Sequence, residues 1–199
     1  MRTAPPVLAM LLLALAAQPA AADPTAQVEG GRTSVELSEG FVTALGSLGV
    51  APGAIEPARL KRGRASFPIP GGALDLETAR GDVFHLGGLT LGAGGTTVGL
   101  LNFVIDTTGE PVLTGLVSVN GDLVGRVPLF DLELTEAPEL RRWGGLRIDG
   151  VNVTLTAEAA NALNMIFGVS DFVEGFEIGV ARVATRIENL DSDEDRDDD

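Results

Sequence analysis

The chain has 199 residues, a length that suits one domain with a substantial core. It carries 28 acidic and 14 basic residues, and its net charge of −14 argues against binding to nucleic acid or to an anionic membrane surface. It contains no cysteine, which excludes disulfides, thiolate metal sites and membrane attachment through a lipidated cysteine.

The N-terminus has the pattern of a secretory signal peptide. Arg2 precedes an apolar run over residues 7–17, and small alanines at residues 20–22 offer a cleavage site before Asp23. Because the apolar run is short for a bilayer span, cleavage after residue 22 is a better interpretation than an uncleaved anchor. We therefore expect an exported bacterial protein, secreted or held in the periplasm or cell envelope, with no membrane span after cleavage of residues 1–22.

Composition divides the remaining chain into three parts. Residues 23–32 predict a flexible polar leader, residues 33–188 a single β domain, and residues 189–199 a disordered acidic tail. Within the tail, three aspartates at every second position match the first half of a calcium-binding loop, but the glycine and the closing glutamate of such a loop are absent. A solvated tail is therefore preferred to a specific calcium site.

A short helix is predicted near the start of the β domain. Ser38 is a suitable N-cap and is followed by an acidic residue, while Phe41, Leu45 and Leu48 fall on one helical face. The prolines and glycine within residues 52–57 then predict an irregular link.

Beyond this link the apolar pattern has a period of two, which is typical of strands. Glycine-rich breaks at residues 70–72 and 92–95 separate successive strands, and residues 97–105 form a nearly continuous apolar strand. The pair Asn120-Gly121 is the strongest short hairpin signal in the chain.

The C-terminal third predicts a second hairpin, a helix and a closing strand. The hairpin turns at residues 149–150, and the helix covers residues 155–168, with Thr156 as its N-cap and Gly168 at its end. The closing strand spans residues 178–187. Many short strands with two short helices predict a mainly β fold, either an antiparallel β-sandwich or an open barrel.

The sequence offers few groups for chemistry. His85 is the only histidine, and without an evident partner it is more consistent with a hydrogen-bonding role than with a metal ligand or general base. Acidic pairs at residues 75/77 and 131/133 each share one strand face rather than facing one another across a cleft, so they are interpreted as solvated. We expect no catalytic residues, no metal site and no enzyme activity. Trp143, the only tryptophan, either covers the core or stacks with an arginine.

Two stretches have a distinctive order of strand residues and glycines. The first is FPIPGG at residues 67–72, followed by Leu74-Asp75 and by GDVFHLGGLTL at residues 81–91. The second is VTLTAEAANAL at residues 153–163, followed by Phe167-Gly168 and by FVEGFEIG at residues 172–179. Together these stretches resemble the HtaA domain of bacterial surface haem-uptake proteins, over about residues 33–187.

The resemblance implies a mostly β domain with two short helices, which binds haem through a tyrosine on the first helix supported by a histidine from the sheet. This chain has no tyrosine, and Phe41 lies on the first helix where the resemblance would place the ligand. Phenylalanine has no oxygen with which to coordinate iron. His85 lies near the segment that would bear the supporting histidine.

These observations predict an exported, non-enzymatic, HtaA-like domain that binds a small apolar ligand or a partner surface. Phe41, Leu45 and His85 would line the binding pocket. No cofactor is required by this interpretation, and an envelope protein is the alternative partner. Two other functions stay open, namely haem binding or uptake through His85 and a structural envelope role in which the acidic tail binds cations.

Overall fold

The computed structural model describes residues 25–75, 78 and 80–188. The predicted signal peptide over residues 1–22 and the predicted acidic tail over residues 189–199 lie outside these ranges and stay predictions.

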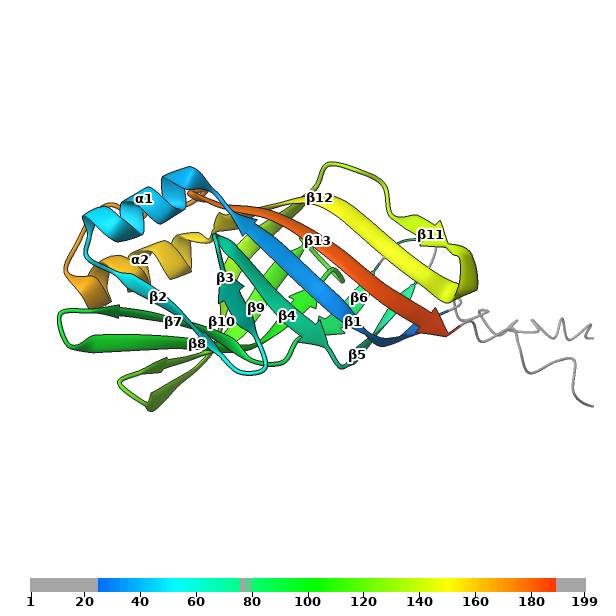
Figure 1. The fold of residues 1–199 in the computed structure, drawn as a ribbon, viewed down its shortest axis with the longest axis horizontal. Helices are drawn as coiled ribbons and strands as arrows, with labels where there is room; N and C mark the ends of the chain where they lie inside the picture. Colours follow the sequence, from blue (N-terminus) through cyan, green and yellow to red (C-terminus); the bar gives the residue numbers. More distant parts are fainter. Residues whose placement is uncertain (1–24, 76–77, 79, 189–199) are drawn as a thin grey trace, which may run out of the picture.

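Eight antiparallel strands form a closed barrel. The ring closes because its last strand pairs with the first strand on one side and with β12 on the other. The mainly β prediction is confirmed, but the barrel is closed rather than open, and the sheet does not divide into a sandwich (Figure 1). In their order around the ring, the strands are β1 (Thr25–Leu37), β5 (Gly71–Asp75), β6 (Gly81–Phe84), β8 (Thr96–Asp106), β9 (Val112–Val119), β10 (Asp122–Leu134), β12 (Gly145–Leu155) and β13 (Glu177–Glu188).

Five shorter strands extend this ring. Two of them, β4 and β3, continue from β1, while β7 and β2 continue from β8, and β11 pairs with β12. The prediction of an irregular link around Pro52 is wrong, because Pro52 lies inside β2. A proline is tolerated there since β2 pairs only with β7 among the described residues and leaves its other edge unpaired. These strands are β2 (Ala51–Ile55), β3 (Arg59–Lys61), β4 (Arg64–Ile69), β7 (Gly88–Ala93) and β11 (Glu139–Arg141).

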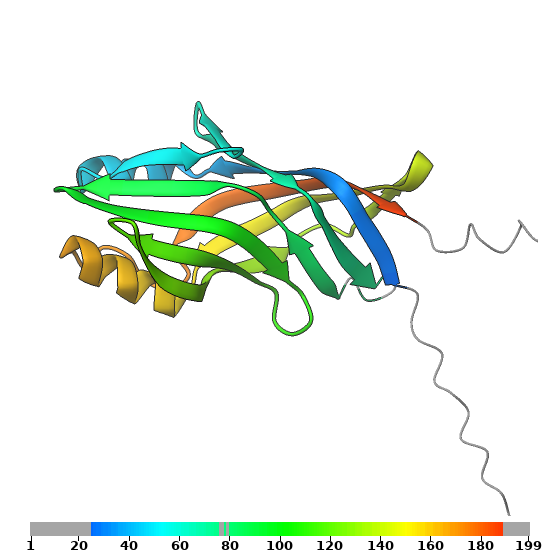
Figure 2. The same cartoon turned by 90° about the horizontal axis from the view of Figure 1, so that it is seen from below.

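Both predicted helices are confirmed, and they lie together at one end of the molecule (Figures 1 and 2). Helix α1 (Glu39–Ser47) begins after Ser38, whose hydroxyl accepts a hydrogen bond from the Phe41 N–H at 3.0 Å. Helix α2 (Ala157–Phe167) begins after Thr156, whose hydroxyl accepts from the Ala159 N–H at 3.1 Å. Gly168 ends α2 in the left-handed conformation that glycine adopts without steric cost.

Two segments differ from their prediction because of long-range pairing. Residues 25–32 are not a flexible leader but the first part of β1, in which Ala26 pairs with Leu74 and Gln27 with Glu188. Residues 149–150 are not a hairpin turn but a bulge inside the continuous strand β12. The hairpin prediction at Asn120-Gly121 is confirmed, since β9 and β10 flank it. The predicted break at residues 92–95 is a shorter turn at residues 94–95 between β7 and β8, and Gly71 and Gly72 of the predicted break at residues 70–72 lie inside β5.

Buried side chains form two clusters. The larger one runs from the helix end, with Phe41 and Leu45, into the barrel, with Phe67 and Phe103. The smaller one lies among β1, β5, β6, β12 and β13 and includes Val28 and Val183. In β13 the burial alternates strictly over its second half, which turns one face of the strand into the barrel and leaves the arginines of the other face exposed.

Candidate ligand-binding site

His85 is placed directly after β6 by hydrogen bonds and by the glycines that follow it. Its backbone N–H donates to the Phe103 carbonyl at 2.8 Å. Gly87 then turns the chain toward β7 with a φ of +80°, and a Cβ at this position would lie 2.5 Å from the Ala58 nitrogen. Only glycine fits such a turn, so the side chain of His85 is held inside the barrel, where the residue is 3% exposed.

The imidazole has one hydrogen-bond partner among the described side chains. Its Nε2 lies 2.7 Å from the Thr33 hydroxyl, which is also buried. Its Nδ1 is buried and has no hydrogen-bond partner of ordinary geometry among the described residues. Leaving a buried polar atom without a partner costs about 1–3 kcal/mol, and native proteins rarely do so. The ring therefore has an unused capacity for one hydrogen bond or one ligand bond.

Burial also sets the protonation state of His85. Removal from water lowers its pKa from 6.5 to about 4, and the nearby carbonyls of Phe103 and Val83 raise the pKa too little to offset this effect. The imidazole is thus neutral at pH 7. A neutral imidazole suits a metal or a hydrogen-bonding ligand, whereas so low a pKa makes a weak general base.

The ring lines a cavity of about 490 Å³ inside the barrel. We call it the barrel cavity. Its size falls within the range of small-molecule sites, about 300–1,000 Å³. Phe67 and Phe103 meet edge to face at 5.2 Å in its wall. Among the described residues the lining contains no lysine or arginine, and its other polar side chains are Thr33, Asp75, Thr78, Thr107 and Thr185.

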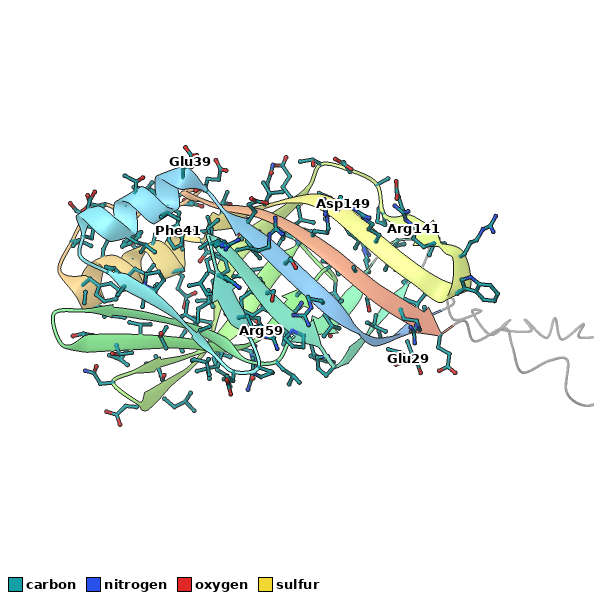
Figure 3. The ribbon with its side chains drawn as sticks, in the orientation of Figure 1. Glu29, Glu39, Phe41, Arg59, Arg141 and Asp149 are labelled. Carbon is teal, nitrogen blue, oxygen red and sulfur yellow. The ribbon has the colours of Figure 1, made fainter. Side chains whose placement is uncertain are left out.

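A second, smaller cavity of about 220 Å³ lies at the helix end, and we call it the helix cavity. Phe41 and α2 residues line it, and Glu158 is the one charged residue in its lining within the described ranges. Figure 3 labels Phe41 beneath α1, where its ring meets that of Phe176 at 6.4 Å. Four side chains line both cavities and so form a layer between them: Leu37, Leu89, Phe130 and Ile178.

The three residues predicted to line one pocket are therefore in three different places. His85 lines the barrel cavity and Phe41 lines the helix cavity. Leu45 is 2% exposed in the packed core and lines neither cavity. Sequence reasoning missed Thr33, the partner of His85. The alternation of polar and apolar residues in β1, where Thr33 precedes Val35 and Leu37 at every second position, could have identified it as an inward residue.

Three other features bear on what the site can do. Among the described residues no group of three or more His, Cys, Asp or Glu side chains is placed to hold a metal ion. His85 contacts no carboxylate there, so no nucleophile–base–acid arrangement is formed around it. In the part of the chain that the structure describes, every helix is too short or too polar to cross a lipid bilayer.

No protein-family model matches the chain, and no curated protein matches its sequence. Its structure is similar to the C-terminal domain of HtaA from Corynebacterium glutamicum, with a TM-score of 0.64 and 15% identity, covering 82% of this chain and 99% of that domain. The N-terminal domain of the same HtaA gives a TM-score of 0.59 at 13% identity, covering 81% of this chain and 99% of that domain. The heme binding protein HtaB from this organism gives 0.52 at 11% identity, covering 82% and 95%. The chain thus has an HtaA-like fold, which confirms the predicted resemblance at the level of fold.

Proposed function

We propose that the chain is an exported, non-enzymatic binding domain that encloses a largely apolar small molecule in the barrel cavity, with haem as the first candidate. The observation that carries this proposal is a buried, neutral imidazole with an unused Nδ1 in a cavity whose lining is mostly aliphatic and aromatic. The likeness to a protein named for heme binding favours haem over an unspecified apolar ligand.

The residues present fit haem in one cavity and not in the other. In the helix cavity, Phe41 has no atom that can coordinate iron, and the ionisable group in the described lining is the Glu158 carboxylate. In the barrel cavity, His85 is a neutral imidazole, the side chain most often used to hold haem iron. His85 rather than Phe41 is therefore the residue that would bind the metal, while the apolar wall would contact the macrocycle.

The lining also supports a non-enzymatic role. A general base works best when its pKa lies near the working pH, and burial holds the pKa of His85 near 4. The hydroxyl beside it belongs to Thr33, with no carboxylate to orient the ring. Nothing among the described residues favours the structural alternative, because its acidic tail lies outside them.

Titration with haem and with iron-free protoporphyrin tests this proposal. We expect a saturable change of the Soret band at one equivalent of haem and saturable fluorescence of bound protoporphyrin. The variant His85→Gln should lose the iron-dependent spectral change but still bind protoporphyrin, because the apolar lining is intact. Phe41→Leu, which alters only the helix cavity, serves as the matched control and should behave like the parent chain.

The two halves of the proposal fail separately. If neither compound shows saturable binding, the domain does not take a porphyrin-sized apolar ligand. If haem binds His85→Gln with the parent spectrum, the ligand role of His85 is contradicted while binding itself stands.

A further inference from the structure

The end of the barrel away from the helices carries an unusual basic groove. Its volume is about 820 Å³, and we call it the arginine groove. Of the acidic side chains that the structure describes, Glu29 alone lines it, in a chain with twice as many acidic as basic residues. Figure 3 labels both Arg141 and Glu29 at this end. The basic and aromatic lining residues are Arg141, Arg142, Trp143, Arg147 and Arg186.

Half of these guanidinium groups already have carboxylate partners. Arg141 pairs with Glu139 and Arg147 with Asp149, each at 2.5 Å. Arg142 and Arg186 make no ion pair with any described residue. The groove therefore presents two exposed positive charges that the described chain does not neutralise.

Trp143 stands beside these charges without packing against the protein. It is 93% exposed, so the predicted role as a cover for the core is wrong. Its backbone is left-handed, with φ 65° and ψ 37°, a conformation that is costly for a bulky residue. A strained, solvent-exposed aromatic side chain next to free arginines is typical of a contact surface rather than of a structural element.

The chain itself supplies a segment of opposite charge at this point. A Cβ on Gly144 would lie 2.5 Å from the Ile187 carbonyl, so the Trp143 turn touches β13 one residue before its end. Figure 1 shows the end of β13 beside the start of β12. Residues 189–199 follow directly and hold seven acidic side chains and one arginine.

We propose that the acidic segment 189–199 binds the arginine groove of its own chain, with carboxylates at Arg142 and Arg186 and backbone or side-chain atoms on the Trp143 ring. Tethering gives this segment a high effective concentration at the groove. A separate acidic partner would instead have to approach a chain of net charge −14.

Trp143 is the only tryptophan, so its fluorescence reports on the groove directly. In the full chain we compare the native tail with a tail of equal length in which the seven acids are replaced by Asn or Gln. At low salt, acrylamide should quench Trp143 more strongly in the neutral-tail chain, by up to about a factor of two, because a bound segment covers one face of the ring. At 1 M NaCl, where the screening length is about 3 Å, the two chains should become alike.

A pair of charge variants assigns the contact to the groove. Arg142→Gln/Arg186→Gln should remove the difference between native and neutral tails. Arg59→Gln/Arg62→Gln, which changes two arginines outside the groove, should preserve it. Equal quenching of native and neutral tails at low salt overturns the proposal. A tail effect that survives the groove variant, or that grows with protein concentration, also overturns it, since the tail would then bind elsewhere or on a second molecule.

Discussion

His85 is held in surroundings that accept only the neutral form of its ring. The folded pKa is about 4 and the ordinary value is 6.5, so between these pH values the unfolded chain binds a proton that the folded chain does not. The contribution of this residue to stability is therefore fully present above pH 6.5 and is lost as the pH falls toward 4. Over this window the loss amounts to about 3 kcal/mol.

The variant His85→Gln isolates this effect. Its amide can still reach the Thr33 hydroxyl but does not titrate. From pH 7 to pH 4 we expect the free energy of unfolding of the parent chain to fall by about 3 kcal/mol more than that of the variant, because the carboxylates titrate in both. Urea unfolding at pH 7, 5.5 and 4 measures the difference. Parallel pH profiles would show that the ring is not desolvated in the folded state.

Phe41 permits a second test at the level of one atom. Phe41→Tyr adds to the helix cavity the hydroxyl that the HtaA resemblance implies. Without ligand we expect a loss of about 1–3 kcal/mol of stability, since apart from Glu158 the described lining of that cavity is apolar and offers the new hydroxyl no side-chain partner. With haem we expect additional binding, with an altered Soret band, that persists in the double variant with His85→Gln. Spectra of Phe41→Tyr identical to those of the parent would show that the helix cavity cannot admit the macrocycle.

Among the elements, β13 decides whether the barrel is closed. It pairs with β1 along one edge and with β12 along the other, and Gly179 lies where both partners are close. A Cβ on Gly179 would lie 2.1 Å from the Glu36 carbonyl, and its φ is +155°. The barrel seam therefore requires glycine at this position.

Replacing this glycine should weaken the seam. We expect Gly179→Ala to lower the free energy of unfolding by about 2 kcal/mol or more, because the backbone of β1 or β13 must move. Gly109→Ala is the matched control, since a Cβ there meets nothing within 4 Å. Chemical denaturation of both variants gives the comparison. Equal stabilities would contradict the close approach of β13 to β1.

Local signals in the sequence were sufficient for the elements that depend on neighbouring residues. Both helices begin after the N-caps expected for them, Ser38 and Thr156, and the hairpin turns at Asn120-Gly121 as predicted. The predicted turn at residues 149–150 was wrong. Pairing with β13 keeps β12 continuous there, although Gly150 would also suit a hairpin turn. The start of β1 was missed because its polar residues gain their order from partners about 50 and 160 residues away.

Only part of the candidate site could be predicted from the sequence. His85 could be selected as the only histidine, and its burial agrees with a core hydrogen-bonding role. Phe41 and His85 line different cavities because four side chains, one each from β1, β7, β10 and β13, meet between them in the interior. Such contacts are set by the register of the strands around the closed ring. A single sequence does not specify this register.

At the scale of the whole molecule, the two ends have different characters. The helix end is closed by α1 and α2 over the helix cavity, while the far end carries the arginine groove and the point at which β13 stops (Figures 1 and 2). The barrel cavity lies on the His85 side of the dividing layer. Leu146 and Thr185 line both the barrel cavity and the arginine groove, so these two sites adjoin at the far end.

The most direct test of ligand binding in the barrel uses two alanines, one in each cavity. Ala181 lines the barrel cavity and Ala159 lines the helix cavity, and both are buried. Each is replaced by phenylalanine, which fills space without adding charge, and circular dichroism confirms that both variants are folded. We expect Ala181→Phe to abolish saturable binding of protoporphyrin and haem, and Ala159→Phe to leave both unchanged. Loss of binding in Ala159→Phe, with full binding in Ala181→Phe, would place the ligand under the helices and contradict a site inside the barrel.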